Sequence, residues 1–188
     1  CKGLVKNENG SYFYDIEDLD HNGNVDLSDG GDRYIAGQAT PKVILGSNIS
    51  FRYKNYYISI QMNGAFGHKI FNGTGLAYTS MACFPDYNVF KDAPKKNIID
   101  QRVSDYWLEK GDYLNFEHLT IGYNVPLRSK LIRSLRVSCN ISNIGTITGY
   151  KGLTPMINSY VVNSTMGIDD KRNYPLYRTY SLGLSVQF

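Results

Sequence analysis

The sequence lacks the features of several common classes of protein. No stretch approaches the roughly 18 consecutive apolar residues that mark a membrane-spanning helix. The charges nearly balance, with a formal net charge of +3 over 188 residues, so the composition indicates no nucleic-acid partner. The chain is nevertheless long enough for one domain with a core of its own.

Cysteine is scarce, and its three positions indicate no structural role. Cys1, Cys83 and Cys139 are an odd set without metal-ligand spacing, so neither a disulfide framework nor a cysteine metal site is predicted. The first residues show no secretory signal. Because position 1 is not methionine, we expect a fragment or a processed chain, and we favour truncation over a lipoprotein anchor at Cys1.

Tryptophan is equally rare, whereas tyrosine is abundant. The sequence has one Trp and 8 Phe against 16 Tyr. Tyrosine suits surfaces that are apolar on one side and wet on the other, such as membrane interfaces and faces that bind carbohydrate or protein. A tyrosine-rich soluble β protein is compatible with the same composition.

The last residues alternate strictly between apolar and polar side chains, which predicts a strand with one apolar and one wet face. A strand that ends on an aromatic residue is typical of the closing strand of an outer-membrane β-barrel, although a soluble sandwich also contains alternating strands. The apolar residues are Tyr180, Leu182, Leu184, Val186 and Phe188.

The same alternation predicts four earlier strands. A tight turn at Lys54 and Asn55 joins the first two into a hairpin. In the third strand the parity slips between Phe116 and Leu119, which predicts a bulge near Glu117 and His118. The predicted strands cover residues 46–53, 56–62, 112–124 and 135–141.

The connections alternate between long and short. The long ones span residues 15–42, 64–111 and 146–175, and the short ones lie near 54–55 and at 125–134. Outer-membrane barrels have long extracellular loops and short periplasmic turns. We therefore predict an all-β fold, an antiparallel up-and-down transmembrane β-barrel segment of about five C-terminal strands from a larger barrel. A soluble lipocalin-like barrel stays open, because periodicity alone does not show which face meets lipid.

On this interpretation residues 1–42 are an extracellular segment, and residues 43–188 are the strands and loops of the barrel. The long connection 64–111 is rich in aromatic residues, which could stack on sugar rings or pack under a partner protein. They could equally form a small core within the loop itself. The candidate binding residues are Tyr78, Phe84, Tyr87, Tyr106 and Trp107. A helical turn or two is expected within 98–108.

The most specific chemical motif is a calcium-type loop at residues 18–29. Gly23 stands at its sixth position, where the backbone must turn sharply, and oxygen ligands recur at the spacing that wraps a chain around a hard cation. The predicted ligands are Asp18, Asp20, Asn22, Asn24 through its carbonyl, Asp26 and Asp29. The last position holds Asp rather than Glu, which favours weaker binding, and the flanks are not amphipathic helices. A bare turn rich in Asp, Asn and Gly is the alternative.

Several segments taken together resemble the C-terminal part of the SusC/RagA-type TonB-dependent outer-membrane transporters of Bacteroidetes. They cover nearly the whole chain in the right order: 18–26, 32–37, Pro41 with the strand after it, 51–55, 106–126, 150–153 and 174–188. In that family the Asp-Arg pair usually follows the calcium-type loop directly, whereas Gly30 and Gly31 intervene here. The last ligand is therefore either Asp29 by spacing or Asp32 by its place before Arg33.

The resemblance implies a fragment of a large barrel in the Gram-negative outer membrane, gated through a TonB complex that contacts a missing N-terminal part. It implies import of an oligosaccharide or peptide with a SusD-like surface lipoprotein, and contact with outer-membrane lipid. The alternative is a soluble or surface calcium-dependent carbohydrate-binding β module. No enzyme is predicted, because His21, His68 and His118 lie near no recognisable nucleophile.

Overall fold

The computed structural model describes residues 1–26, 28, 31–128, 131–157, 166–171 and 173–188. The chain forms two compact units, each assembled from three separate segments. The loop unit comprises 1–40, 68–110 and 150–174, and the sheet unit comprises 41–67, 111–149 and 175–188. No helix among the described residues has the length and apolar character needed to cross a bilayer. The division predicted from the sequence, into an extracellular segment at 1–42 and barrel strands and loops at 43–188, concerns membrane topology and stays a prediction.

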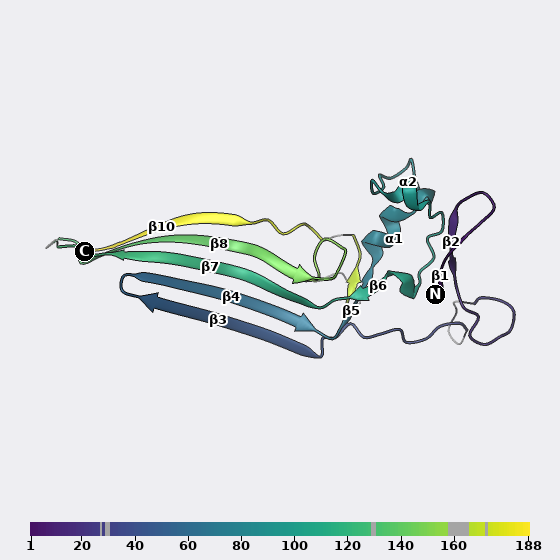
Figure 1. Ribbon diagram of the computed structural model, residues 1–188, viewed down its shortest axis with the longest axis horizontal. Coiled ribbons are helices and arrows are strands. Elements are labelled where there is room, and N and C mark those ends of the chain that lie inside the picture. The colour runs from purple at the N-terminus through teal and green to yellow at the C-terminus, as the bar shows by residue number, and fades with distance from the viewer. Residues whose placement is uncertain (27, 29–30, 129–130, 158–165, 172) are drawn as a thin grey trace. The chain divides into compact units, whose positions relative to one another are not determined.

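The sheet unit is a single antiparallel sheet of five strands (Figure 1). Each strand pairs with its neighbour in the order β10-β8-β7-β4-β3. The five strands predicted from alternation are confirmed, and three of them extend further than the alternation indicates. Their bounds are β3 Val43–Tyr53, β4 Tyr56–Phe66, β7 Tyr113–Val125, β8 Ser134–Thr148 and β10 Thr179–Gln187.

The register of the five strands aligns apolar residues with apolar residues and polar residues with polar residues across the whole sheet. One apolar row runs Phe51, Ile58, Ile121, Cys139 and Leu182, with each residue opposite the next. The neighbouring row is polar throughout and runs Ser50, Ser59, Thr120, Asn140 and Ser181. Because alternate residues of a strand point to opposite faces, the sheet has one apolar face and one wet face.

The predicted bulge in the third long strand is confirmed. Phe116 pairs with Met62 and His118 pairs with the adjacent Gln61, so the register of β7 shifts between Phe116 and His118 against β4. The extra residue is Glu117, whose Oε2 accepts hydrogen bonds from the Gln61 and Asn63 side-chain amides at 3.1 and 3.0 Å. The bulge thus brings a carboxylate within reach of two donors on β4.

Gly122 lets an aromatic ring lie flat on the wet face. A Cβ atom at this position would stand only 1.9 Å from the Tyr57 ring. Arg136 covers the same ring, with its guanidinium carbon 5.3 Å from the ring centroid, and its Nε donates to Asn124 Oδ1 at 2.9 Å. Glycine is needed here because any side chain would displace Tyr57.

The apolar face of the sheet unit is open. Ala65 is the one buried apolar residue among the described part of this unit, whereas Phe51 is 65% exposed and Leu182 is 84% exposed. A folded domain in water does not normally leave a contiguous apolar surface uncovered. The apolar face of this sheet therefore requires an apolar environment.

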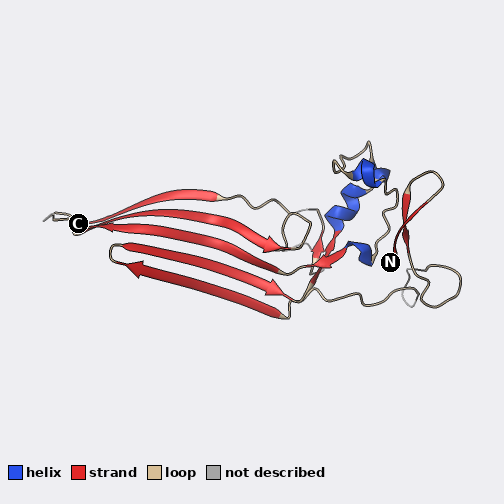
Figure 2. Cartoon of the chain, in the orientation of Figure 1, coloured by secondary structure: helices blue, strands red, loops and turns tan. Residues whose placement is uncertain are grey.

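The loop unit contains all the described helices and five short strands (Figure 2). Strands β1 and β2 form a hairpin, and β6, β5 and β9 form a second small sheet. The strand bounds are β1 Gly3–Lys6, β2 Tyr12–Asp15, β5 Lys69–Asn72, β6 Leu108–Lys110 and β9 Ile168–Asp169. The helices are α1 Gly73–Thr79, η1 Met81–Cys83, α2 Ala93–Lys96 and η2 Asp105–Trp107.

Helix η2 falls within the stretch where the sequence predicts a helical turn, but α1 and α2 are not predicted. Helix α1 contains two glycines and has no apolar stripe of helical period. It begins instead at a local cap, where Asn72 Oδ1 accepts from the Gly75 backbone N–H at 2.6 Å. A side-chain cap and packing inside the unit outweigh the low helix propensity of this segment.

Tyr14, Ile98 and Trp107 form the buried cluster at the centre of the loop unit. The Trp107 indole N–H donates to the Tyr14 hydroxyl at 2.7 Å. The Tyr106 ring packs against both aromatic residues, with centroid separations of 5.5 Å to Tyr14 and 5.2 Å to Trp107. Residues of the long connection 64–111 and of the first segment of the chain therefore form one small core.

Candidate functional site

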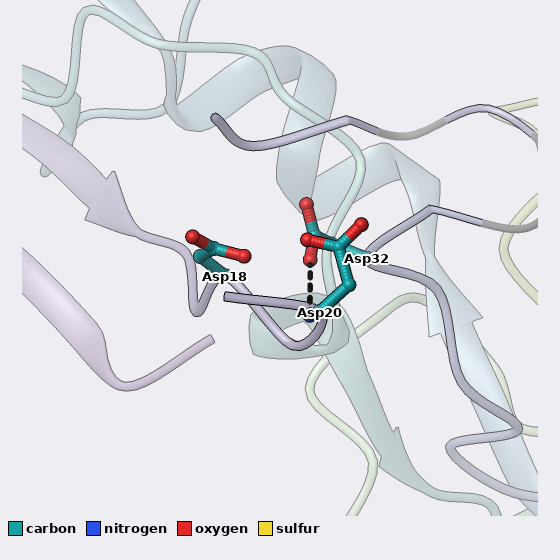
Figure 3. Close-up of side chains that lie close together, drawn as sticks. All are labelled: Asp18, Asp20 and Asp32. Carbon is teal, nitrogen blue, oxygen red and sulfur yellow. Dashed lines mark hydrogen bonds between the residues drawn. The ribbon is translucent and has the colours of Figure 1, made fainter. Parts of the chain in front are cut away.

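Three carboxylates meet in the calcium-type loop. Asp18, Asp20 and Asp32 each contribute one oxygen, and these oxygens lie within 4.8 Å of one another (Figure 3). Asp32 is buried, Asp18 is half-buried and Asp20 is exposed. The group therefore opens toward solvent on one side and is anchored on the other.

Asp32 is the anchor. Its Oδ1 accepts from the backbone N–H of Leu19 at 2.5 Å and of Asp20 at 3.3 Å, the contact dashed in Figure 3. Its Oδ2 accepts from the Asp26 N–H at 2.7 Å. The Asp32 N–H in turn donates to the Asp26 carbonyl at 2.7 Å. These contacts fold residues 19–26 around one carboxylate.

Short-range contacts shape the rest of the loop. Asp18 Oδ2 accepts from the Gly23 N–H at 2.8 Å, and Gly23 has a φ of +85°, as a sharp turn requires. Asn22 Oδ1 accepts from the Asn24 N–H at 2.8 Å, and Asp20 Oδ2 accepts from the Asn22 amide at 2.7 Å. The Gly23 N–H holds the pKa of Asp18 below its usual value, which keeps this carboxylate charged.

Some of the predicted ligands lie together in the structure and others do not. Asp18 and Asp20 come together, and Asn22 lies beside them. Asp26 directs its carboxylate to Ser28, which donates its N–H at 2.8 Å and its hydroxyl at 2.6 Å and lowers the pKa of Asp26. Asp29 lies outside the described residues. Asp32, the alternative closing residue, is the third member of the cluster.

The arrangement fits a hard cation. Three carboxylates at this separation repel one another unless positive charge lies between them. Asp18 Oδ1 is buried and has no hydrogen-bond partner among the described residues, which is costly for a charged oxygen. Oxygen ligands of this kind are those that Ca²⁺ prefers.

A cavity of about 340 Å³ in the loop unit is lined by residues that follow Asp32, among them Arg33 and Tyr34. The Tyr34 hydroxyl donates to Asp105 Oδ2 at 2.6 Å, and this carboxylate raises the pKa of Tyr34. This hydrogen bond ties the segment after the carboxylate cluster to the first residue of η2.

A second cavity, of about 430 Å³, contains two of the predicted aromatic residues, Tyr78 and Tyr87. Its wall combines aromatic, aliphatic and hydrogen-bonding groups from α1, η1 and the segments beside them. The lining residues are Gly73, Leu76, Ala77, Tyr78, Cys83, Tyr87, Gln101 and Lys171. We call it the tyrosine cavity.

The other predicted binding residues lie in different surroundings. Phe84 is 58% exposed and Tyr106 is 42% exposed, whereas Trp107 is buried in the aromatic cluster with Tyr14. The buried position of Trp107 agrees with the second interpretation of the connection 64–111, in which its aromatic residues form a small core instead of a binding surface. A binding role for the five residues stays a prediction.

Asp169 is a buried hub that the sequence does not reveal. It is fully buried and accepts from Thr74 Oγ1 at 2.8 Å, the Tyr150 hydroxyl at 2.7 Å and the Asn173 amide at 3.1 Å. Burial and, next, the bond to Asp169 raise the pKa of Tyr150 well above its usual value, so Tyr150 remains a donor. Thr74 and Tyr150 are 95 and 19 residues away in sequence, so no local motif could indicate the hub.

Comparisons with known proteins agree with this architecture. No protein-family model matches the chain. The chain is 28% identical over 188 residues to TonB-dependent receptor P3 of Formosa agariphila, covering 91% of this chain. It is 27% identical over 196 residues to TonB-dependent receptor SusC of Bacteroides thetaiotaomicron, covering 98% of this chain. In both cases the match spans only 18% of the relative's length.

Solved structures give the same result for the fold. The RagAB peptide importer in its closed-closed state matches 99% of this chain with a TM-score of 0.66 and 16% identity, over 22% of that chain. A second RagAB structure, of the peptide transporter, gives a TM-score of 0.64 at the same identity. The sheet unit and loop unit therefore have the fold of a segment of a TonB-dependent receptor barrel. Within that class the chain is similar to the SusC/RagA type, so the resemblance predicted from the sequence is confirmed.

Proposed function

We propose that this chain is part of the wall and the extracellular loops of an outer-membrane importer driven by a TonB complex. The observation that carries the proposal is the open apolar face, which runs across five strands of a sheet with the fold of a receptor barrel. In an outer-membrane barrel this face meets lipid and the wet face lines the lumen. The similarity to TonB-dependent receptors supports the transport function.

The sheet also has the aromatic residues expected at a membrane interface. Tyr53, Tyr56 and Tyr123 lie in one row on the apolar face, next to the short connection between β3 and β4. The Tyr56 and Tyr123 rings are 4.7 Å apart. Such a row marks the boundary between lipid and water. We place the short connections in the periplasm, and residues of the loop unit outside the cell.

This orientation is tested by two arginine substitutions on adjacent residues of β7. Ile121→Arg puts a charge on the apolar face, one row from the tyrosine row, and is expected to destabilise the assembled barrel by about 1–2 kcal/mol if that face meets lipid. Thr120→Arg puts the same charge on the wet face, where only its hydroxyl bond to Asn140 Oδ1 (2.9 Å) is lost. The amount of folded, heat-modifiable protein in isolated outer membranes is the measurement.

We expect Ile121→Arg to reduce the folded band strongly and Thr120→Arg to reduce it slightly. The opposite order would reverse the two faces and contradict the proposal. A protein recovered in a soluble fraction, with both variants folded, would favour a calcium-dependent carbohydrate-binding module instead.

The proposed cargo is an oligosaccharide or a peptide, delivered with a SusD-like surface lipoprotein. The similarity to SusC and to the RagAB peptide importer supports a substrate and a lipoprotein partner of this kind, and the chain spans 18% of the length of its two relatives. Within this chain the tyrosine cavity is our candidate for contact with cargo or partner. Tyr78 and Tyr87 supply flat aromatic faces there, and Gln101 and Lys171 supply polar groups. The proposed role in import involves no catalysis.

We also propose that the carboxylate cluster binds Ca²⁺, with Asp18, Asp20 and Asp32 as the charged ligands and Asn22 beside them. The converging oxygens and the buried, unpartnered Asp18 Oδ1 support this proposal. A bound cation would remove the repulsion among the carboxylates and stabilise residues 18–32. Asp26 is a ligand only if it exchanges its bonds to Ser28 for the ion.

Calorimetric titration of Ca²⁺ tests the metal site. Asp20→Asn removes one charged ligand while retaining the shape of the side chain and is expected to weaken binding by about tenfold or more. Glu8→Gln, an exposed acid outside the loop, is the matched control and should bind like the unmodified protein. Equal titration curves for the two variants would contradict a site at this cluster. Comparing Asp29→Asn with Asp32→Asn then identifies the closing ligand.

A further inference from the structure

Charge is segregated along the sheet unit. Its three segments contain only two acids, Asp112 directly before β7 and Glu117 in the first half of that strand. The opposite end, where β3 turns into β4 and β7 connects to β8, has basic residues and no acid. The described basic residues of this end are Arg52, Lys54, Arg128, Arg133 and Arg136, and all of them are exposed. We call it the basic end.

Part of this charge lies beside the apolar face. The Lys54 ammonium lies over the Tyr53 ring, 5.3 Å from its centroid, and Tyr53 belongs to the tyrosine row of the apolar face. The connection between β7 and β8 adds Leu131, which is 82% exposed. The Arg133 N–H donates to the Gln187 carbonyl at 2.7 Å, which fastens the connection to the end of β10. Cations, an aromatic row and an exposed leucine thus share one edge.

The remaining charge lies on the wet face. Arg136 covers the Tyr57 ring and bonds Asn124, and Arg52 lies opposite Tyr57 in the register. These two arginines contact the face that we assign to the lumen. Arg133 directly precedes β8 and has the parity of Leu135 and Val137, so continuing the strand pattern assigns it, with Lys54, to the apolar side, whereas Arg52 and Arg136 lie on the wet face.

We propose that the lipid side of the basic end binds the headgroups of anionic phospholipids. The tyrosine row would lie at the headgroup level, Leu131 would enter the acyl region, and Lys54, Arg128 and Arg133 would bind phosphate groups. Basic residues beside a membrane attract anionic lipid, and the effect is about fivefold in affinity for each charge near the surface. The absence of acids from this end of the described sheet leaves that attraction unopposed. The inference rests on the proposed membrane orientation.

The test uses the whole protein that contains this chain, reconstituted in vesicles of phosphatidylcholine with or without a minor fraction of fluorescent phosphatidylglycerol. Energy transfer from protein tryptophan to the labelled lipid reports local enrichment. We expect enrichment in the unmodified protein and a decrease of about fivefold or more in Lys54→Gln/Arg133→Gln. The matched double variant Arg52→Gln/Arg136→Gln removes the same charge from the wet face and should keep the enrichment.

The outcomes separate this inference from the proposed function. Insertion into both vesicle types without any preference for phosphatidylglycerol would overturn the lipid site and leave the membrane orientation intact. An equal decrease in the two double variants, or a decrease confined to Arg52→Gln/Arg136→Gln, would also overturn it and indicate an acidic protein segment on the wet face. Failure of the unmodified protein to insert in any vesicle would contradict the proposed function itself.

Discussion

Replacing Asp169 by alanine is expected to lower the free energy of unfolding of the loop unit by about 3–5 kcal/mol. The substitution removes the acceptor for the Tyr150 and Thr74 hydroxyls, which are both buried. A buried donor left without a partner costs about 1–3 kcal/mol, and here several donors share one acceptor. The hub also joins β9 to α1, so its loss should loosen segments that are far apart in the sequence.

Hydrogen exchange of the backbone amides, followed by mass spectrometry on the whole protein, measures this effect. Peptides covering β5, α1 and β9 should exchange about 100-fold faster or more in Asp169→Ala if they open as one unit. Asp86→Asn, an exposed acid of the same unit, is the control and should leave exchange unchanged. Asp169→Asn retains an acceptor oxygen and should fall between them. Unchanged exchange in Asp169→Ala would refute the role of the hub.

Replacing Trp107 by alanine should destabilise the loop unit by a similar amount, about 3–5 kcal/mol. The indole is buried against Tyr14 and Ile98, so its removal leaves a cavity in the small core of this unit. It also leaves the Tyr14 hydroxyl without the indole donor at 2.7 Å. If Trp107 instead serves mainly to bind cargo, the same variant would lose binding while retaining its stability.

The matched variant for this prediction is Trp107→Phe. It retains an aromatic ring in the cluster but has no N–H for Tyr14, so a smaller loss of about 1–2 kcal/mol is expected. Thermal unfolding of the whole protein, monitored together with exchange of peptides covering η2 and β2, gives both values. Equal stabilities of the alanine variant and the unmodified protein would show that the aromatic cluster is not the core of the unit.

The pattern of side chains along the chain determined the sheet. Strict alternation in residues 180–188, 46–53 and 135–141 predicts strands, because only an extended backbone places alternate residues on one face. The slip in parity after Phe116 likewise predicts the bulge, since one extra residue inverts the facing of all that follow. These features are local, so the sequence alone contains them.

The calcium-type loop was readable in part for the same reason. Asp18, Asp20 and Gly23 are close in sequence, and their spacing indicates the turn that the structure contains. Asp32 could not be chosen over Asp29 from spacing, because the choice depends on where the chain returns after the loop. The backbone N–H groups of Leu19 and Asp26 place Asp32 in the cluster.

Only the tertiary structure decided what the long connections do. Helix α1 has weak helix formers, and it exists because Asn72 caps it and the unit packs around it. Trp107 could equally have been an exposed binding residue, and Asp169 belongs to no motif. Their roles depend on partners 19 to 95 residues away. Sequence patterns record the period of one strand or helix, whereas burial and shared hydrogen bonds arise only when distant segments fold against each other.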